Sequence, residues 1–244
     1  GNRRVTAEDV ERLATLYQCS PSVLLSGQQD DEINRDCDVL ADVVHAFPDI
    51  RDDSERFTEV QQVVAIARTL TDVERRLGLD SYSLGPHAYD VGTPNIAWEA
   101  MEQGFQAADE ERRRLNLGDA PIRDLDHTLV MKRIRMTKID FPKDVTAVFV
   151  NSQQTGFLII VNRRLPIEAR RFHYAHGFGH SLFDRHHRSF VCSAECRQDF
   201  VEVRASAFAN GFLLPESSLR RYLESLGKEV RGRTGGVELA LFSE

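Results

Sequence analysis

The chain has 244 residues, of which 41% are hydrophobic and 28% are charged, and its formal net charge is -7. This composition is typical of a globular protein with one large domain, with or without a small appendage, and enough apolar material for a real core. The negative charge gives no support for nucleic-acid binding through bulk electrostatics, and no apolar run approaches the roughly 20 residues of a membrane span.

The cysteine content and the start of the chain indicate where the protein works. Four cysteines in a chain of this length do not form the disulfide framework of a small secreted protein, and no signal-peptide segment is recognisable. We therefore expect a cytoplasmic protein, in which Cys192 and Cys196 are ordinary reduced thiols rather than a second metal site. The sequence begins at Gly1 without an initiator methionine, so we expect further sequence upstream.

The first half of the chain has helical patterns throughout. Thr6 and Asp9 are placed to cap a first helix, and a second short helix follows within residues 1–26. Residues 31–117 are predicted to form a helical region. Its apolar stripes repeat at helical spacing over residues 40–47, over residues 57–70 with an end near Gly78, and over residues 97–117.

Residues 118–226 combine helices with short strands. After a helix at residues 122–131, we expect strands at residues 134–140, 146–150 and 156–161, the last two forming a hairpin. Pro166 opens a long helix, a loop follows at residues 192–196, and two helices cover residues 198–214 and 215–226. Residues 227–244 form a Gly-rich, charged tail. The predicted fold is α+β and mostly helical, with a small sheet preceded by an N-terminal helical region.

Two histidines four residues apart in the helix opened by Pro166 are candidate metal ligands. His176 and His180 lie one turn apart on the same helical face, as two imidazoles must to share one Zn²⁺. Such a pair alone is more often structural than metal-binding. A third ligand would complete a site with one open position, and Glu202, on a later helix with its own apolar stripe, is the candidate.

Two blocks of this region resemble the ImmA/IrrE family of regulatory zinc metallopeptidases. Members typically carry N-x₇-R-F-T-x-A-H-E-x-G-H followed by E-x-x-A-N-x-F-A-x-x-L-L-x-P. Here the first block runs from Asn162 to Arg171-Phe-His-Tyr-Ala-His-Gly-Phe-Gly-His180, and the second from Glu202-Val-Arg-Ala to Phe-Leu-Leu-Pro215. The resemblance extends over about residues 120–215.

The resemblance implies a zincin-like metallopeptidase core at residues 118–226, with His176, His180 and Glu202 as ligands of a zinc ion. Family members commonly cut a repressor or antitoxin, so a repressor- or antitoxin-like protein is the expected partner. Residues 1–26 resemble the end of an Xre-type helix-turn-helix, and a simple helical hairpin is the alternative. DNA binding would then depend on a domain that is largely missing from this chain. No membrane partner is expected, and the oligomeric state is not indicated.

Gly177 stands where the family carries the glutamate that accepts a proton from the attacking water. Glycine cannot do this, and loss of a general base costs on the order of 10²–10⁴ in rate. The natural protein is then a pseudopeptidase, or glycine was introduced to block cleavage, or another residue serves as the base. His173 and Asp184 lie on the same helical face as the two histidines and are the candidates for that accessory role.

Overall fold

The computed structural model describes residues 6–16, 54–79, 85–141, 145–152, 155–185, 189–193 and 199–225. Its centre is a sheet of four strands, β1 (Ile134–Ile139), β2 (Val145–Ser152), β3 (Gly156–Asn162) and β4 (Ser189–Ser193), in the order β1-β3-β2-β4. β2 and β3 form an antiparallel hairpin, β1 runs parallel to β3, and β4 is antiparallel to β2. All seven residues of β3 are buried, because neighbouring strands flank it and helices cover both faces of the sheet.

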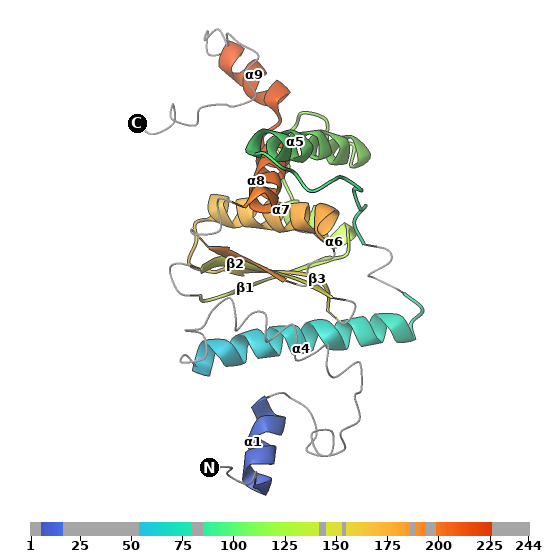
Figure 1. The fold of residues 1–244 in the computed structure, drawn as a ribbon. Helices are drawn as coiled ribbons and strands as arrows, with labels where there is room; N and C mark the ends of the chain where they lie inside the picture. The colour runs from blue at the N-terminus through green and yellow to red at the C-terminus, as the bar shows by residue number, and fades with distance from the viewer. Residues whose placement is uncertain are drawn as a thin grey trace.

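Helices lie in layers on the two faces of this sheet (Figure 1). α7 (Ile167–Phe183) lies on one face and α4 (Ser54–Arg76) crosses the other, while α6 (Leu125–Met131) leads into β1. α8 (Phe200–Leu213) packs on α7, and α5 (Ala97–Arg114) packs on α8. α1 (Ala7–Leu16) and α9 (Glu216–Ser225) lie at opposite ends of the described structure.

Two apolar clusters fill the spaces above and below the sheet. The larger one joins the sheet to α6, α7, α8 and α5, and includes Phe149, Phe157, Ile159, Phe178, Phe208 and Phe212. The smaller one joins the other face of the sheet to α4, and includes Val60, Val64, Ala67, Phe141, Val148 and Ile160. Both clusters contain residues from before position 118, so the helices of the first half complete the core around the sheet.

Small residues let α5 and α8 approach closely. A Cβ at Gly104 of α5 would lie 2.4 Å from the carbonyl oxygen of Arg204 in α8, and one at Gly211 would lie 2.9 Å from Phe105. Arg112 of α5 is only 3% exposed and donates a hydrogen bond to the carbonyl oxygen of Phe212, one of the carbonyls at the end of α8 that lack a partner within the helix. It also donates to the carbonyl oxygens of Gly118 and Ala120 in the loop after α5. The two helices therefore form a dry, closely packed pair.

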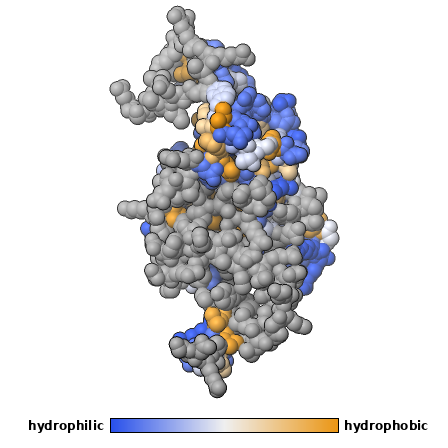
Figure 2. All heavy atoms as spheres, in the orientation of Figure 1, coloured by the Kyte–Doolittle hydropathy of each residue, from blue (hydrophilic) through white to orange (hydrophobic). Residues whose placement is uncertain are grey.

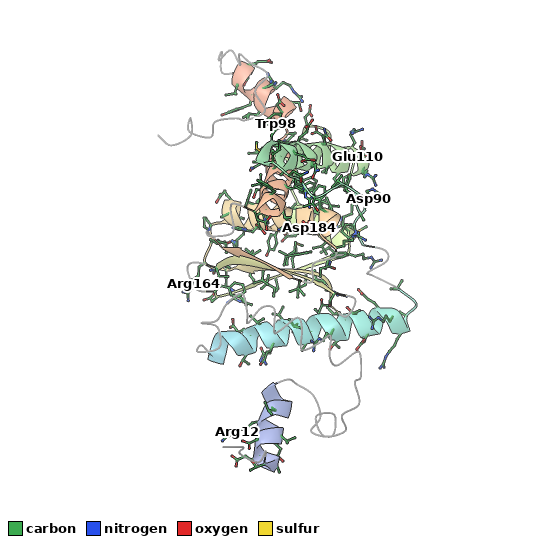
Figure 3. All side chains as sticks on the ribbon, viewed as in Figure 1. Arg12, Asp90, Trp98, Glu110, Arg164 and Asp184 are labelled. Carbon is green, nitrogen blue, oxygen red and sulfur yellow. The ribbon has the colours of Figure 1, made fainter. Side chains whose placement is uncertain are left out.

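Polar and apolar side chains are interspersed on the surface around α5, as the space-filling view shows (Figure 2). Trp98 and Ile96 are 56% and 58% exposed there, and Figure 3 labels Trp98. Among the described residues, no helix is long and apolar enough to cross a membrane.

Most of the predicted elements agree with the structure, and the α+β, mostly helical class is confirmed. Thr6 and Asp9 cap α1 reciprocally: the Asp9 amide donates to Thr6 Oγ1 at 3.2 Å, and the Thr6 amide donates to Asp9 Oδ2 at 3.0 Å. The loop expected at residues 192–196 is wrong at its start, because β4 pairs with β2 as far as Ser193. The stripe at residues 40–47, the tail at 227–244 and the Cys192 and Cys196 side chains lie outside the described part.

Candidate metal centre

His176 and His180 reach the site from the middle of α7. Both side chains are buried, with residue exposures of 3% and 0%, because α7 is enclosed between the sheet and α8. Their Nε2 atoms lie 3.0 Å apart, so both rings present the same nitrogen to one point. The His180 ring also stacks on Phe149 of β2, with ring centroids 5.8 Å apart, and this contact fixes its plane over the sheet.

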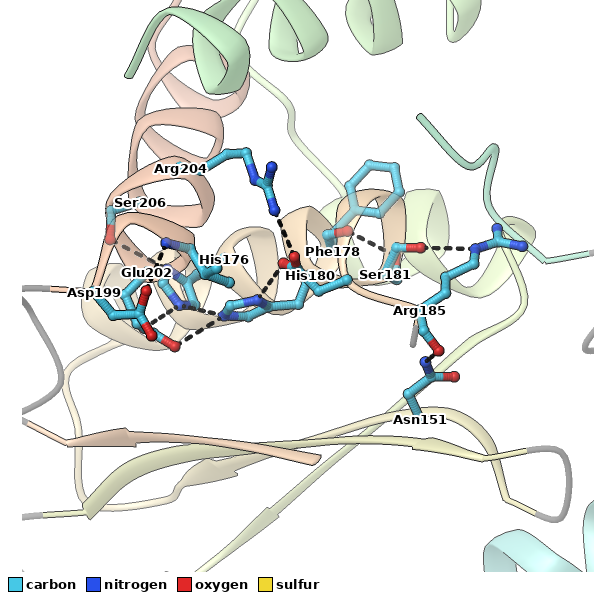
Figure 4. A network of polar contacts seen from close by, with 12 residues as sticks. Asn151, His176, Phe178, His180, Ser181, Arg185, Asp199, Glu202, Arg204 and Ser206 are labelled. Carbon is cyan, nitrogen blue, oxygen red and sulfur yellow. Dashed lines mark hydrogen bonds and ion pairs between the residues drawn. The ribbon is translucent and has the colours of Figure 1, made fainter. Parts of the chain in front are cut away.

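Glu202, in the first turn of α8, closes the cluster from the other side (Figure 4). Its Oε2 lies 3.1 Å from His176 Nε2, and its Oε1 lies 3.3 Å from His180 Nε2. Asp199 caps the start of α8, because its carboxylate accepts a hydrogen bond from the Val201 amide at 3.0 Å, and this cap fixes the first turn in which Glu202 lies. The three residues predicted from the sequence are therefore brought together in space, and they form a potential three-ligand group.

The electrostatics of Glu202 suit a group that stays ionised in a buried site. Burial by itself raises the pKa of this carboxyl, but hydrogen bonds from His176 and His180 outweigh it and hold the pKa well below its usual range. An ionised carboxylate facing two imidazole nitrogens is a typical donor set for Zn²⁺.

The distances among the three donors also fit one small cation. A tetrahedral zinc ion with ligands at 2.0–2.1 Å needs its ligand atoms about 3.3 Å apart. The two Nε2 atoms lie 3.0 Å apart, and each lies 3.1–3.3 Å from a different oxygen of Glu202, so the three side chains enclose a space of about this size. A zinc ion held by these three residues would have one coordination position left for a water or a substrate oxygen.

Asp184 supports His180 from behind. Its Oδ2 lies 2.9 Å from His180 Nδ1, the ring nitrogen opposite the cluster, and its Oδ1 accepts a hydrogen bond from Arg204 Nη2 at 2.6 Å. Asp184 is fully buried inside the helical layer (Figure 3). Its carboxylate therefore faces away from the Nε2 side of the cluster, where a proton acceptor for a metal-bound water would have to lie.

His173 lies one turn before His176 but outside the three-ligand group. Its ring is edge-on to His176 with centroids 6.4 Å apart, and it also contacts Phe172 edge-on. The Nδ1 atom of His173 is buried and has no hydrogen-bond partner among the described residues. The structure thus places this residue beside a candidate ligand without giving it a direct contact to the other two.

Gly177 packs directly against the sheet. A Cβ at this position would lie 2.7 Å from Cδ1, 3.0 Å from Cγ1 and 3.2 Å from Cγ2 of Ile159 in β3. Ile159 is 1% exposed, so its side chain already fills the space that a residue larger than glycine would need. Position 177 therefore carries no acid or base, and its surroundings are packed for glycine.

Three polar residues around the cluster were not predicted from the sequence. Arg204 pairs with Asp184 and also donates to Gln103 Oε1 at 3.1 Å, and the Ser206 hydroxyl lies 3.4 Å from His176 Nδ1. Arg204 could have been suspected from the sequence, because it is the one basic residue in the mostly apolar helix α8. Gln103 left none, since it comes from α5, about a hundred positions away in the sequence.

The fold belongs to the zincin-like class of metallopeptidases. In this class a helix with two histidines one turn apart packs on a small mixed sheet, and a later helix supplies a carboxylate. Residues 132–234 match the family model described as the IrrE N-terminal-like domain, peptidase family M78. This match agrees with the resemblance to the ImmA/IrrE family that the sequence blocks predicted. A search of curated proteins found no match.

Proposed function

We propose that this protein is a regulator of the ImmA/IrrE type that binds Zn²⁺ through His176, His180 and Glu202 and acts on a repressor- or antitoxin-like protein. The observation that carries the proposal is the convergence of three buried side chains, in which the two histidine Nε2 atoms lie 3.0 Å apart and each lies 3.1–3.3 Å from one oxygen of Glu202. Burial at this depth without a metal or full hydrogen bonding would be costly for three polar side chains. The family match over residues 132–234 supports a regulatory metallopeptidase ancestry.

The residues of this chain account for metal binding better than for hydrolysis. A bound zinc ion would supply Lewis-acid activation of a water and of the scissile carbonyl. Asp184 would hold the His180 ring in its binding orientation, and Ser206 lies where it can do the same for His176. Position 177, which in the family provides the base, has no side chain and no free space. We infer that hydrolysis is impaired by about 10²–10⁴ relative to an enzyme with that base.

A metal-content measurement tests the site. We expect one zinc ion per chain in the purified protein, and its loss in His176→Ala, His180→Ala and Glu202→Ala. His127→Ala is the matched control, because His127 is an exposed histidine on α6. Zinc-free wild-type protein after incubation with Zn²⁺, or full zinc content in the three ligand variants, would remove the basis of the proposal.

The second candidate function is a non-catalytic regulator that uses the same fold to bind its protein partner. The packing of Ile159 against Gly177 favours it, because the region behind position 177 is filled and not left vacant. This reading predicts a partner complex that survives His176→Ala. Dissociation of the complex on zinc removal would count against it.

Restoring the base separates the two candidates. Gly177→Glu alone collides with Ile159, so the informative variant is Gly177→Glu combined with Ile159→Ala, which vacates the space. Zinc-dependent cleavage of a co-expressed partner by the double variant supports an impaired peptidase. An uncut partner, with zinc bound and the fold intact by circular dichroism, supports the non-catalytic regulator.

DNA binding is a further proposal, and the sequence upstream of Gly1 decides whether a complete helix-turn-helix precedes this chain.

A further inference from the structure

α4 carries a stripe of exposed aliphatic residues that the core does not use. Ile66, Leu70, Val73 and Leu77 are 60%, 47%, 48% and 69% exposed, and the partly buried Val63 continues the stripe toward the start of the helix. Successive members are three, four, three and four residues apart, which is the spacing of a helix-pairing seam. We call these five residues the α4 seam.

The seam is separate from the face by which α4 joins the fold. Val60, Val64, Ala67 and Thr71 form the inner face, and they are buried beneath the sheet. At 100° per residue, the seam lies roughly 110° around the helix from this inner face. Isolated exposed apolar residues need no explanation, but five aliphatic residues in continuous register along four turns do.

We propose that the α4 seam is the surface through which two copies of this chain associate, with the two α4 helices antiparallel and the two-fold axis at Leu70. In this arrangement Leu70 meets its own copy, Ile66 faces Val73, and Val63 faces Leu77. Each contact repeats on both sides of the axis, as an isologous interface requires. All five seam residues are aliphatic, so no charged residue of the seam meets its own copy across the axis.

The charges at the ends of α4 favour the antiparallel direction. The last turn carries Arg76, whereas Glu59 lies on the line of the seam one turn before Val63. Antiparallel pairing about Leu70 carries Glu59 of one copy just past the last turn of the other helix, the turn that carries Arg76. Parallel pairing would instead place the two Glu59 side chains against each other, which is unfavourable.

The size of the seam is sufficient for a specific but modest dimer. Its exposed aliphatic surface is on the order of 400 Å² per chain, the size at which apolar patches mark interaction sites. With the flanking side chains, pairing would bury on the order of 1,000 Å² in total, near the lower limit of stable interfaces. The metal centre lies on the opposite face of the sheet, so the dimer would leave both centres open.

Sedimentation equilibrium on the full chain tests the proposal. We expect a reversible dimer for the wild type, and a monomer for Leu70→Glu, which places two carboxylates at the axis. Arg75→Glu is the matched control, because Arg75 is an exposed residue of the same helix on the side away from the seam, and it should remain dimeric. Circular dichroism and zinc content should be unchanged in both variants.

Two complementation experiments establish the partner and its direction. Mixing Leu70→Glu with Leu70→Lys should restore a dimer, because only a second copy places residue 70 against residue 70. Ile66→Glu combined with Val73→Lys in one chain should dimerise with itself only if the helices are antiparallel. A monomeric wild type at concentrations on the order of 100 μM would overturn the proposal, since a partner of another kind or another segment of this chain would then cover the seam. Failure of both the mixture and the double variant to form a dimer would overturn it as well.

Discussion

Gly177 sets the distance between α7 and the sheet. The contact with Ile159 admits an additional carbon atom only if that side chain shifts, since three of its atoms lie within 3.2 Å of the Cβ position. Glycine in a helix is normally unfavourable, by about 1 kcal/mol relative to alanine. The close packing of α7 on β3 offsets this cost, because the helix carrying both candidate ligands sits directly on the strand.

Substitution of this glycine by alanine should therefore destabilise the protein although alanine favours helices. The propensity gain of about 1 kcal/mol is smaller than the overpacking cost, which reaches about 3 kcal/mol in tight cores. We expect Gly177→Ala to lower the free energy of unfolding by about 1 kcal/mol or more in urea denaturation. Ile159→Val removes the closest atom, so the double variant should lose less than the sum of the two single variants. Strict additivity would contradict the packing explanation.

Asp184 acts on the metal centre only through His180, and its substitution should show this. Asp184→Asn retains an oxygen that can accept from His180 Nδ1 but removes the negative charge that Arg204 also contacts. We expect zinc affinity to fall by about tenfold in Asp184→Asn, and by up to about 100-fold in Asp184→Ala, as for other residues that orient metal ligands. Competition with a chromophoric chelator measures both affinities, and unchanged affinity in Asp184→Ala would show that His180 needs no such support.

The residues of the site differ in how far the sequence could predict them. The convergence of His176, His180 and Glu202 was predictable, because their spacing and family pattern mark these three residues as candidate ligands. The role of Asp184 was not, since only the direction of the His180 ring decides which nitrogen it contacts. The tight contact of Gly177 with Ile159 depends on the register between a helix and a strand, and no local pattern fixes that register.

At the scale of elements, α8 connects the two halves of the chain. One side of it contacts α7, and the other contacts α5 at Gly104, where an added Cβ would meet backbone atoms of α8. Its apolar sequence predicted a buried stripe, but the second buried side follows from α5, a helix far away in the sequence. β4 was missed for a similar reason, because a five-residue strand depends on its hydrogen bonds to β2.

The α5–α8 contact predicts a large effect for a small substitution. Gly104→Ala would place Cβ 2.4 Å from the Arg204 carbonyl oxygen, and backbone atoms cannot rotate away as a side chain can. We expect a loss of about 2–3 kcal/mol in the free energy of unfolding, against the gain that helix propensity alone would give. Gly92→Ala is the control with open space around it. Equal stabilities of the two variants would show that the helices can separate at little cost.

At the scale of the whole molecule, the ionisation of buried tyrosines sets an alkaline limit on stability. Burial raises the pKa of Tyr174 to about 12, and the nearby Asp126 raises it further than Arg170 lowers it. Burial also raises the pKa of Tyr89, reinforced by Glu111, whose carboxylate accepts a hydrogen bond from the Tyr89 hydroxyl at 3.1 Å. Tyr174 lies in α7 and Tyr89 borders the same apolar cluster, so both tyrosines report on the packing around the helix that carries the two candidate histidine ligands.

The sign of the effect follows from the direction of these shifts. A tyrosine whose pKa is higher in the folded state stabilises the fold fully below its unfolded pKa of about 10, and loses that contribution as the pH rises. We expect the urea midpoint of unfolding to fall between pH 10 and pH 12. Tyr174→Phe should reduce this fall, because phenylalanine keeps the ring and removes the ionisation, while Tyr222→Phe, at an exposed tyrosine of α9, should not. If the wild type, Tyr174→Phe and Tyr222→Phe showed the same pH dependence, the alkaline transition would be due to groups other than Tyr174.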